Sequence, residues 1–154
     1  MTSESSADTA TKPFVLDTAS VLGRNKPLLL AALRQGGAVS ATVTYTGVGD
    51  SGSVEDLHIE TEQGPAFKTG TSVLVFIERS QYDDGTWHID IVEESLTIDQ
   101  ALRDFAADAV DLLHGGWENG DGASGSVIFD VVNATVRVEH TAYFTNSDYD
   151  ETTL

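Results

Sequence analysis

The segment Thr97–Leu113 has the strongest periodic pattern in the chain and restricts what the chain can fold into. Thr97 and Gln100 have the spacing of a capping box at the start of a helix. Apolar residues then recur at spacings of three and four, which predicts an amphipathic helix. These residues are Ile98, Ala101, Leu102, Phe105, Ala109, Leu112 and Leu113. Such a helix has to bury its apolar stripe against a second layer.

A shorter helix is predicted earlier in the chain, around Leu28–Leu33. Asn25 can act as its N-cap, and Pro27 is tolerated in a first turn because the missing N–H group has no helical partner there. Gly36 and Gly37 then favour the end of the helix. The chain therefore has two helices that need an apolar surface to cover.

Six further segments predict β-strands. In most of them apolar and polar residues alternate, which is the pattern of a strand with one buried face. Val73–Ile77 is continuously apolar, which predicts a strand covered on both faces. Asp84-Gly85 and Asn133-Ala134 are expected as tight turns, so neighbouring strands should be antiparallel. The six segments are Val39–Thr46, Ser53–Glu60, Val73–Ile77, Trp87–Val92, Ser126–Val131 and Val136–Phe144.

The order of these elements, α-β-β-β-β-α-β-β, predicts an α+β fold. We expect a mostly antiparallel sheet of five or six strands with the two helices packed on one face. Residues 13–146 are predicted to form a single domain. Residues 1–12 are small and polar and predict a disordered tail, and residues 147–154 are expected to form a loose acidic tail.

The charge balance is strongly acidic, with 8 basic and 25 acidic residues and a net charge of −17. Residues 1–46 hold four of the bases and only three acids, so nearly all the negative charge lies in the rest of the chain. Such a field repels nucleic acid and anionic membranes. It favours a basic protein partner, bound cations, or solubility alone. If the partner itself binds nucleic acid, carboxylates that imitate phosphates would make this chain a DNA-mimic inhibitor.

The chain has no cysteine, which excludes disulfides and thiolate metal sites. Its first residues lack the basic start and apolar core of a secretory signal, and no apolar run approaches the length of a membrane span. A cytoplasmic protein is therefore expected. No catalytic residue is predicted, because the metalloprotease, nucleophile-elbow, P-loop and dinucleotide-binding motifs are all missing from the sequence.

The polar face of the Thr97–Leu113 helix is the first candidate site. Asp104, Asp108 and Asp111 lie on it, and a row of carboxylates can guide a basic partner onto a docking surface. Trp117 and Asn119 follow the helix and could add a stacking surface and an amide. A solvated helix face and a tryptophan that anchors packing would explain the same residues. The predicted function is that of an acidic, non-enzymatic interaction protein that binds a basic partner.

Two acidic, glycine-rich segments, Gly49–Asp56 and His114–Gly122, form the second candidate site. Carboxylate and amide oxygens are the ligands that calcium and magnesium prefer. The alternative function is therefore a divalent-cation module, or a metal-dependent enzyme, in which both segments converge on one ion. A polar hairpin turn and a helix end followed by a turn would account for them without a ligand. The candidate ligands are Asp50, Glu55, Glu118 and Asp121.

Taken together, the stretches NKPLLLAALRQGGAVSATVTYTGVGDSGSVEDL and LHGGWENGDGASGSVIFDVVNATVRVEHTAYFTNSDYDE resemble the DUF6878 family of small bacterial proteins of unknown function. The resemblance covers most of residues 25–150 and departs around Thr61–Ser80 and at the extreme C-terminus. It implies a bacterial protein of a kind that chromosomes, plasmids and mobile elements encode. It also implies that the two acidic glycine-rich segments belong to one design, and it implies no activity.

Overall fold

The computed structural model describes residues 15–48, 51–62, 67–115, 122–143 and 147–154. The segment 1–12, predicted as a disordered tail, lies outside the described residues. Within the described residues, two helices and seven strands follow in the order α-β-β-β-β-α-β-β-β. They are α2 (Val21–Gln35), β1 (Ala38–Val48), β2 (Ser51–Thr61), β3 (Ser72–Asp83), β4 (Thr86–Thr97), α3 (Ile98–Leu113), β5 (Ala123–Asp130), β6 (Thr135–Tyr143) and β7 (Ser147–Thr153).

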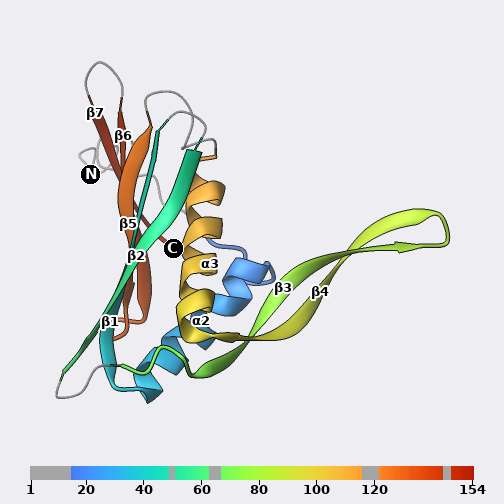
Figure 1. Cartoon of the computed structure of the whole chain (residues 1–154), viewed down its shortest axis with the longest axis horizontal. Coiled ribbons are helices and arrows are strands. Elements are labelled where there is room, and N and C mark those ends of the chain that lie inside the picture. Colours follow the sequence, from blue (N-terminus) through green and yellow to red (C-terminus); the bar gives the residue numbers. More distant parts are fainter. Residues whose placement is uncertain (1–14, 49–50, 63–66, 116–121, 144–146) are drawn as a thin grey trace, which may run out of the picture.

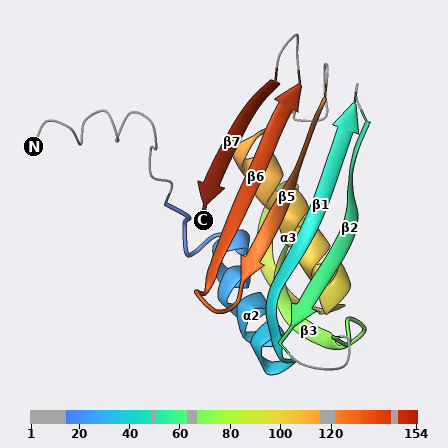
Figure 2. The same cartoon turned by 90° about the vertical axis from the view of Figure 1, so that its left-hand side faces the viewer.

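Five strands form one sheet in the order β2-β1-β5-β6-β7, and every neighbouring pair in it is antiparallel. Both helices lie on the same face of this sheet (Figures 1 and 2). The predicted α+β class, with two helices on one face of an antiparallel sheet, is confirmed.

The core lies between α3 and the inner face of the sheet. The ring of Phe105 on α3 packs against the ring of Phe129 on β5, with centroids 5.3 Å apart. Burying one phenylalanine side chain stabilises a fold by about 1.5–3 kcal/mol. The sheet contributes fully buried residues from alternate positions. The largest of these are Phe129, Val43, Val127, Val136 and Val138.

The helix α3 begins as predicted, because the backbone N–H of Gln100 donates to Thr97 Oγ1 at 3.1 Å. Its buried stripe is rotated slightly from the predicted one. Ala106 and Val110 are buried, whereas Leu112 is 55% exposed. Leu112 is exposed because it points into a groove beside β3 and not toward the sheet.

The helix α2 begins earlier than predicted, at Val21, with Ser20 as its N-cap. Asn25 is therefore not a cap but a buried residue inside the helix. Its Nδ2 donates to the carbonyl oxygen of Phe76 at 2.9 Å, and the N–H of Phe76 donates to its Oδ1 at 2.8 Å. Both backbone groups of one β3 residue are thus satisfied by a helix side chain, on the strand edge that β4 does not cover.

The strands β3 and β4 form a separate two-stranded hairpin, which we call the arm, and they do not join the five-stranded sheet. The arm projects away from the helices and the sheet (Figure 1). At its tip Asp84 and Gly85 have φ values of 52° and 76°, the positive values of the tight hairpin turn that was predicted. The prediction that Val73–Ile77 is covered on both faces was wrong. Val75 is buried and Leu74 is 52% exposed, because the helices cover only one face of the base of the arm.

The C-terminal segment, expected as a loose tail, forms β7 along β6. The N–H of Leu154 donates to the carbonyl oxygen of Val136 at 2.9 Å. The connection between β5 and β6 also differs from the prediction. It holds the four residues 131–134 and not a tight two-residue turn, since Asp130 is the register partner of Thr135.

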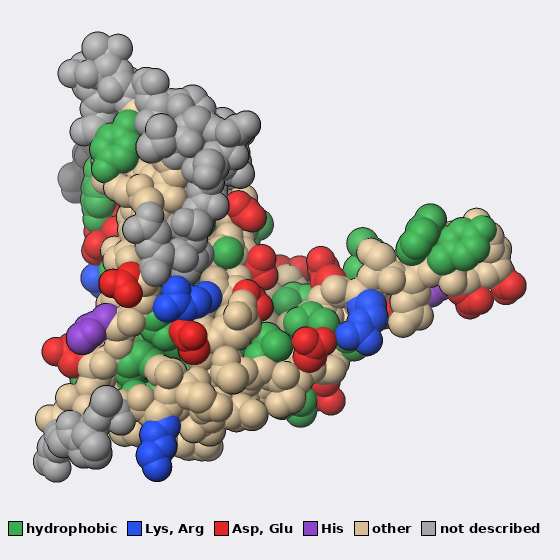
Figure 3. Space-filling view, in the orientation of Figure 1, with side chains coloured by type: hydrophobic (Ala, Val, Ile, Leu, Met, Phe, Trp, Pro, Cys, Tyr) green, Lys and Arg blue, Asp and Glu red, His purple; other side chains and the backbone are tan. Residues whose placement is uncertain are grey.

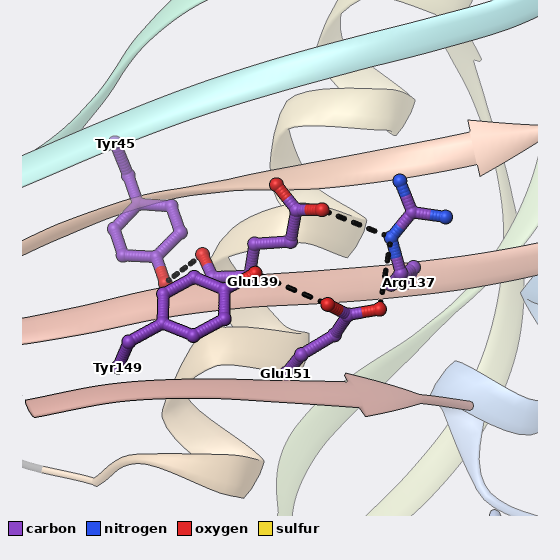
Figure 4. Close-up of polar contacts among 5 residues, drawn as sticks. All are labelled: Tyr45, Arg137, Glu139, Tyr149 and Glu151. Atoms are coloured by element: carbon purple, nitrogen blue, oxygen red, sulfur yellow. Dashed lines mark hydrogen bonds and ion pairs between the residues drawn. The ribbon is translucent and has the colours of Figure 1, made fainter.

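The outer face of the sheet, opposite the helices, is polar. Arg137 Nε lies 3.1 Å from Glu139 Oε2 and 3.4 Å from Glu151 Oε2, and the hydroxyl of Tyr149 donates to Glu151 (Figure 4). Partly exposed ion pairs of this kind contribute about 0–1 kcal/mol each. This face therefore remains in contact with water, and the structure has one main core.

The two hydrogen bonds between Asn25 and Phe76 yield a stability prediction. Asn25→Ala removes both bonds and leaves two backbone groups of Phe76 without a partner, so we expect it to cost about 2–3 kcal/mol of unfolding free energy. The measurement is urea denaturation, with hydrogen exchange at the Phe76 amide. Asn133→Ala is the control, because its side chain donates to Asp130 in a solvent-exposed hydrogen bond. An equal loss in the two variants would contradict the role given to Asn25.

Candidate functional site

The predicted acidic face of α3 lies beside the base of the arm. Asp104, Asp108 and Asp111 share the outward face of the helix, one turn apart, and β3 adds Glu78 to the same cluster. Burial and the negative charges of Asp104, Asp111 and Glu78 raise the pKa of Asp108 from its usual 3.8 to about 6, with burial the larger cause. The folded protein therefore carries a carboxylate at neutral pH that its surroundings disfavour.

Two α3 side chains next to the cluster make polar contacts. Gln100 donates to Asp104 Oδ1 at 2.7 Å, and Arg103 is directed to Asp99 at 2.8 Å. Among the residues that the structure describes, no lysine or arginine lies within ion-pair distance of Asp108. No lysine or arginine of the described residues thus neutralises the charge of Asp108.

The cluster borders a groove of about 540 Å³ between α3, β3 and the first turns of α2. Asp104, Asp108 and Glu78 stand along it, and apolar side chains such as Phe105 and Leu112 line the rest. Acidic side chains gather where the arm leaves the body of the protein (Figure 3). We call this feature the acidic groove. An apolar lining with carboxylates beside it suits a cationic group on an apolar stem, such as a lysine or arginine side chain.

Sequence reasoning identified the three aspartates but not Glu78. Helical spacing alone placed the aspartates on one face. Glu78 follows an apolar run in a strand, and nothing in that pattern shows which helix the strand approaches. Two other acids lie away from this cluster: Asp83 ends β3 at the tip of the arm, and Asp99 pairs with Arg103.

The other predicted site residues cannot be placed together. Asp50, Trp117, Glu118, Asn119 and Asp121 lie outside the described residues. The backbone of Glu55 lies in β2, at a register shift between the partners of Thr44 and Tyr45, which makes it the extra residue of a β-bulge. Within the described ranges, no group of three or more His, Asp or Glu residues is arranged to hold a metal ion.

A second polar cluster, missed by sequence reasoning, lies where α3 ends. The imidazole rings of His114 and His140 stack with centroids 3.8 Å apart and planes 6° apart. His140 Nδ1 is 2.6 Å from the hydroxyl of Tyr45, and His114 Nε2 is 3.5 Å from Asp150 Oδ2. The two histidines are 26 residues apart in the sequence, so no local pattern links them. They come together only because the end of α3 lies against β6.

The surroundings disfavour the charged form of both histidines. Burial lowers the pKa of His140 to about 4, and the positive charge that His114 could carry lowers it further. Burial also lowers the pKa of His114, against the opposite effect of Asp150. Gly125 leaves room for this cluster, since a Cβ atom there would collide with the Tyr45 hydroxyl and with the Glu139 carbonyl.

The fold and the site define a small acidic α+β protein with a protruding hairpin and a carboxylate-lined groove at its base. The chain belongs to a family of unknown function, DUF6878, whose sequence pattern it matches over residues 21–154. The resemblance inferred from the two long stretches is thereby confirmed. No curated protein and no solved structure matches the chain. In the part of the chain that the structure describes, no helix is long and apolar enough to cross a membrane.

The histidine pair yields a prediction on acid stability. Because the pKa of His140 is lowered from 6.5 to about 4, the unfolded chain binds more protons between these values. The stability that neutral His140 contributes is complete above pH 6.5 and is lost as the pH falls toward 4. His140→Phe keeps an aromatic ring that can stack on His114 and removes one titrating group. We therefore expect the melting temperature of this variant to fall less steeply than that of the native chain between pH 6.5 and 4. If the melting temperature of the variant falls with pH as steeply as that of the native chain, the acid sensitivity comes from the carboxylates and not from His140.

Proposed function

We propose that this chain is an acidic interaction protein that binds a basic protein partner through the acidic groove. The observation that carries the proposal is the charge of Asp108, which the folded protein holds next to three other carboxylates with no described cation beside it. A lysine or arginine of a partner placed there would relieve this repulsion on binding. Affinity would then come from charges that the free protein has already brought together.

The shape of the groove supports a protein partner more than a free metal ion. Hard cations need several oxygens converging at about 2.3–2.6 Å. Here the carboxylates stand along an open groove that is partly lined with apolar side chains. A partner that offers both a positive charge and an aliphatic stem can use both parts of the surface.

The chain has a net charge of −17, which speeds association with a basic partner and lowers affinity for nucleic acid itself. If that partner is a nucleic-acid-binding protein, the acidic groove would occupy the surface that normally takes phosphates. A cytoplasmic location fits a chain without cysteine.

Isothermal titration with a synthetic helical peptide of leucine and lysine tests this proposal. We expect binding at low ionic strength that weakens as salt rises, because exposed charges are screened. The double variant Asp104→Asn with Asp108→Asn should lower the affinity about five- to tenfold, as expected for two partly exposed ion pairs.

The matched control is Asp56→Asn with Glu60→Gln, which removes the same charge from the outer face of β2. If the control lowers affinity as much as the groove variant, binding depends on total charge and the groove has no special role. Circular dichroism of both variants shows that the fold is retained. Peptide binding that the groove variant leaves unchanged would overturn the proposal.

A further inference from the structure

The outer half of the arm exposes an apolar stripe. In an antiparallel hairpin, residues that are register partners project from the same face. Tyr82 pairs with Trp87, and Ile89 lies two residues further along β4, so the three side chains share one face. They are 61%, 68% and 64% exposed. The rings of Tyr82 and Trp87 pack edge to face with centroids 5.2 Å apart.

We expect another surface to cover this apolar stripe. An isolated two-stranded hairpin is marginally stable in water, and here only the base of the arm touches the helices. Apolar side chains cover one edge of the outer end of the arm, with acidic side chains on the opposite edge (Figure 3). Because large aromatic side chains carry roughly 150–250 Å² each, the stripe presents on the order of 300–400 Å² of surface.

A surface that could receive the apolar stripe lies on the outward side of α2. A groove of about 870 Å³ runs there, and among its lining are Pro27, Leu30 and Ala31. Three bases also line it, Arg24, Lys26 and Arg34. Arg24 and Arg34 donate to the carbonyl oxygens of Ala19 and Val131, and Lys26 donates to the backbone oxygen of Leu154. We call this feature the α2 groove.

The charges of the two surfaces are opposite. The arm carries six carboxylates and one arginine over residues 72–97. The helix α2 carries three of the eight bases of the chain and no acid. In so acidic a chain, a partly apolar groove whose charged side chains are all bases is well suited to receive an apolar, acidic arm.

We infer that the arm of each chain docks in the α2 groove of a second copy. Reciprocal docking of two arms closes a two-fold dimer and leaves no free arm from which a fibre could grow. Two arms and two grooves would together bury on the order of 1,200–1,600 Å², the size of a standard stable interface. The inference is independent of the acidic groove, because Tyr82, Trp87 and Ile89 lie in the outer half of the arm.

Sedimentation equilibrium and light scattering on the full chain test the inference. We expect a mass of twice the 16.4 kDa of one chain. Ile89→Lys in the arm and Ala31→Glu in the α2 groove should each raise the dimer dissociation constant about tenfold or more. Tyr149→Lys is the control for the arm variant, since Tyr149 is 57% exposed on the outer face of the sheet and should leave the dimer intact.

Mixing the two interface variants gives the decisive result. One half of the mixed dimer pairs a native arm with a native groove, and the other half faces a lysine with a glutamate. We therefore expect the mixture to regain a dimer that neither variant forms alone. A monomeric native chain would overturn the inference. So would a dimer that Ile89→Lys breaks and Ala31→Glu does not, since the arms would then pair with each other. Failure of the mixture to recover would overturn it as well.

Discussion

The packing of α3 on the sheet is the constraint from which the rest of the structure follows. The sheet has one apolar face, and α3 has one apolar stripe, so Phe105 must meet Phe129. Once that contact is made, the aspartates of α3 can only point away from the sheet. The base of the arm lies on that side, and Glu78 completes the cluster. The acidic groove is thus a consequence of how the core is formed.

The second constraint is that the arm leaves the body of the protein. The side chain of Asn25 forms the two backbone hydrogen bonds of Phe76 that a neighbouring strand would otherwise form. At Phe76, the edge of β3 that β4 does not cover therefore contacts α2 and not another strand. The apolar residues further out then have nothing in the same chain to cover them. An exposed stripe of this size usually marks an interaction surface. The arm thus lines part of the acidic groove with its base and exposes the apolar stripe at its outer end.

Much of the fold could be predicted from the sequence. The capping box at Thr97, the Asp84-Gly85 turn and the alternating strands depend on local chemistry, and all three are observed. The separation of the arm could not be predicted, because Trp87 and Ile89 alternate with polar residues as in a strand that faces a core. The strand β7 could not be predicted either, because it has acidic residues at positions where apolar residues would have indicated a strand. Glu78 and the histidine pair depend on tertiary contacts that no local pattern contains.

The central claim is that burial and the neighbouring carboxylates of the acidic groove disfavour the charged form of Asp108, and that the positive charge of a basic partner stabilises this form. An NMR-detected pH titration of the Asp108 carboxyl carbon, with and without the leucine-lysine peptide, tests it most directly. In the free protein the pKa should lie near the raised value of about 6. With the peptide bound it should fall toward the ordinary value of 3.8. A bound peptide that leaves this pKa unchanged would contradict the account.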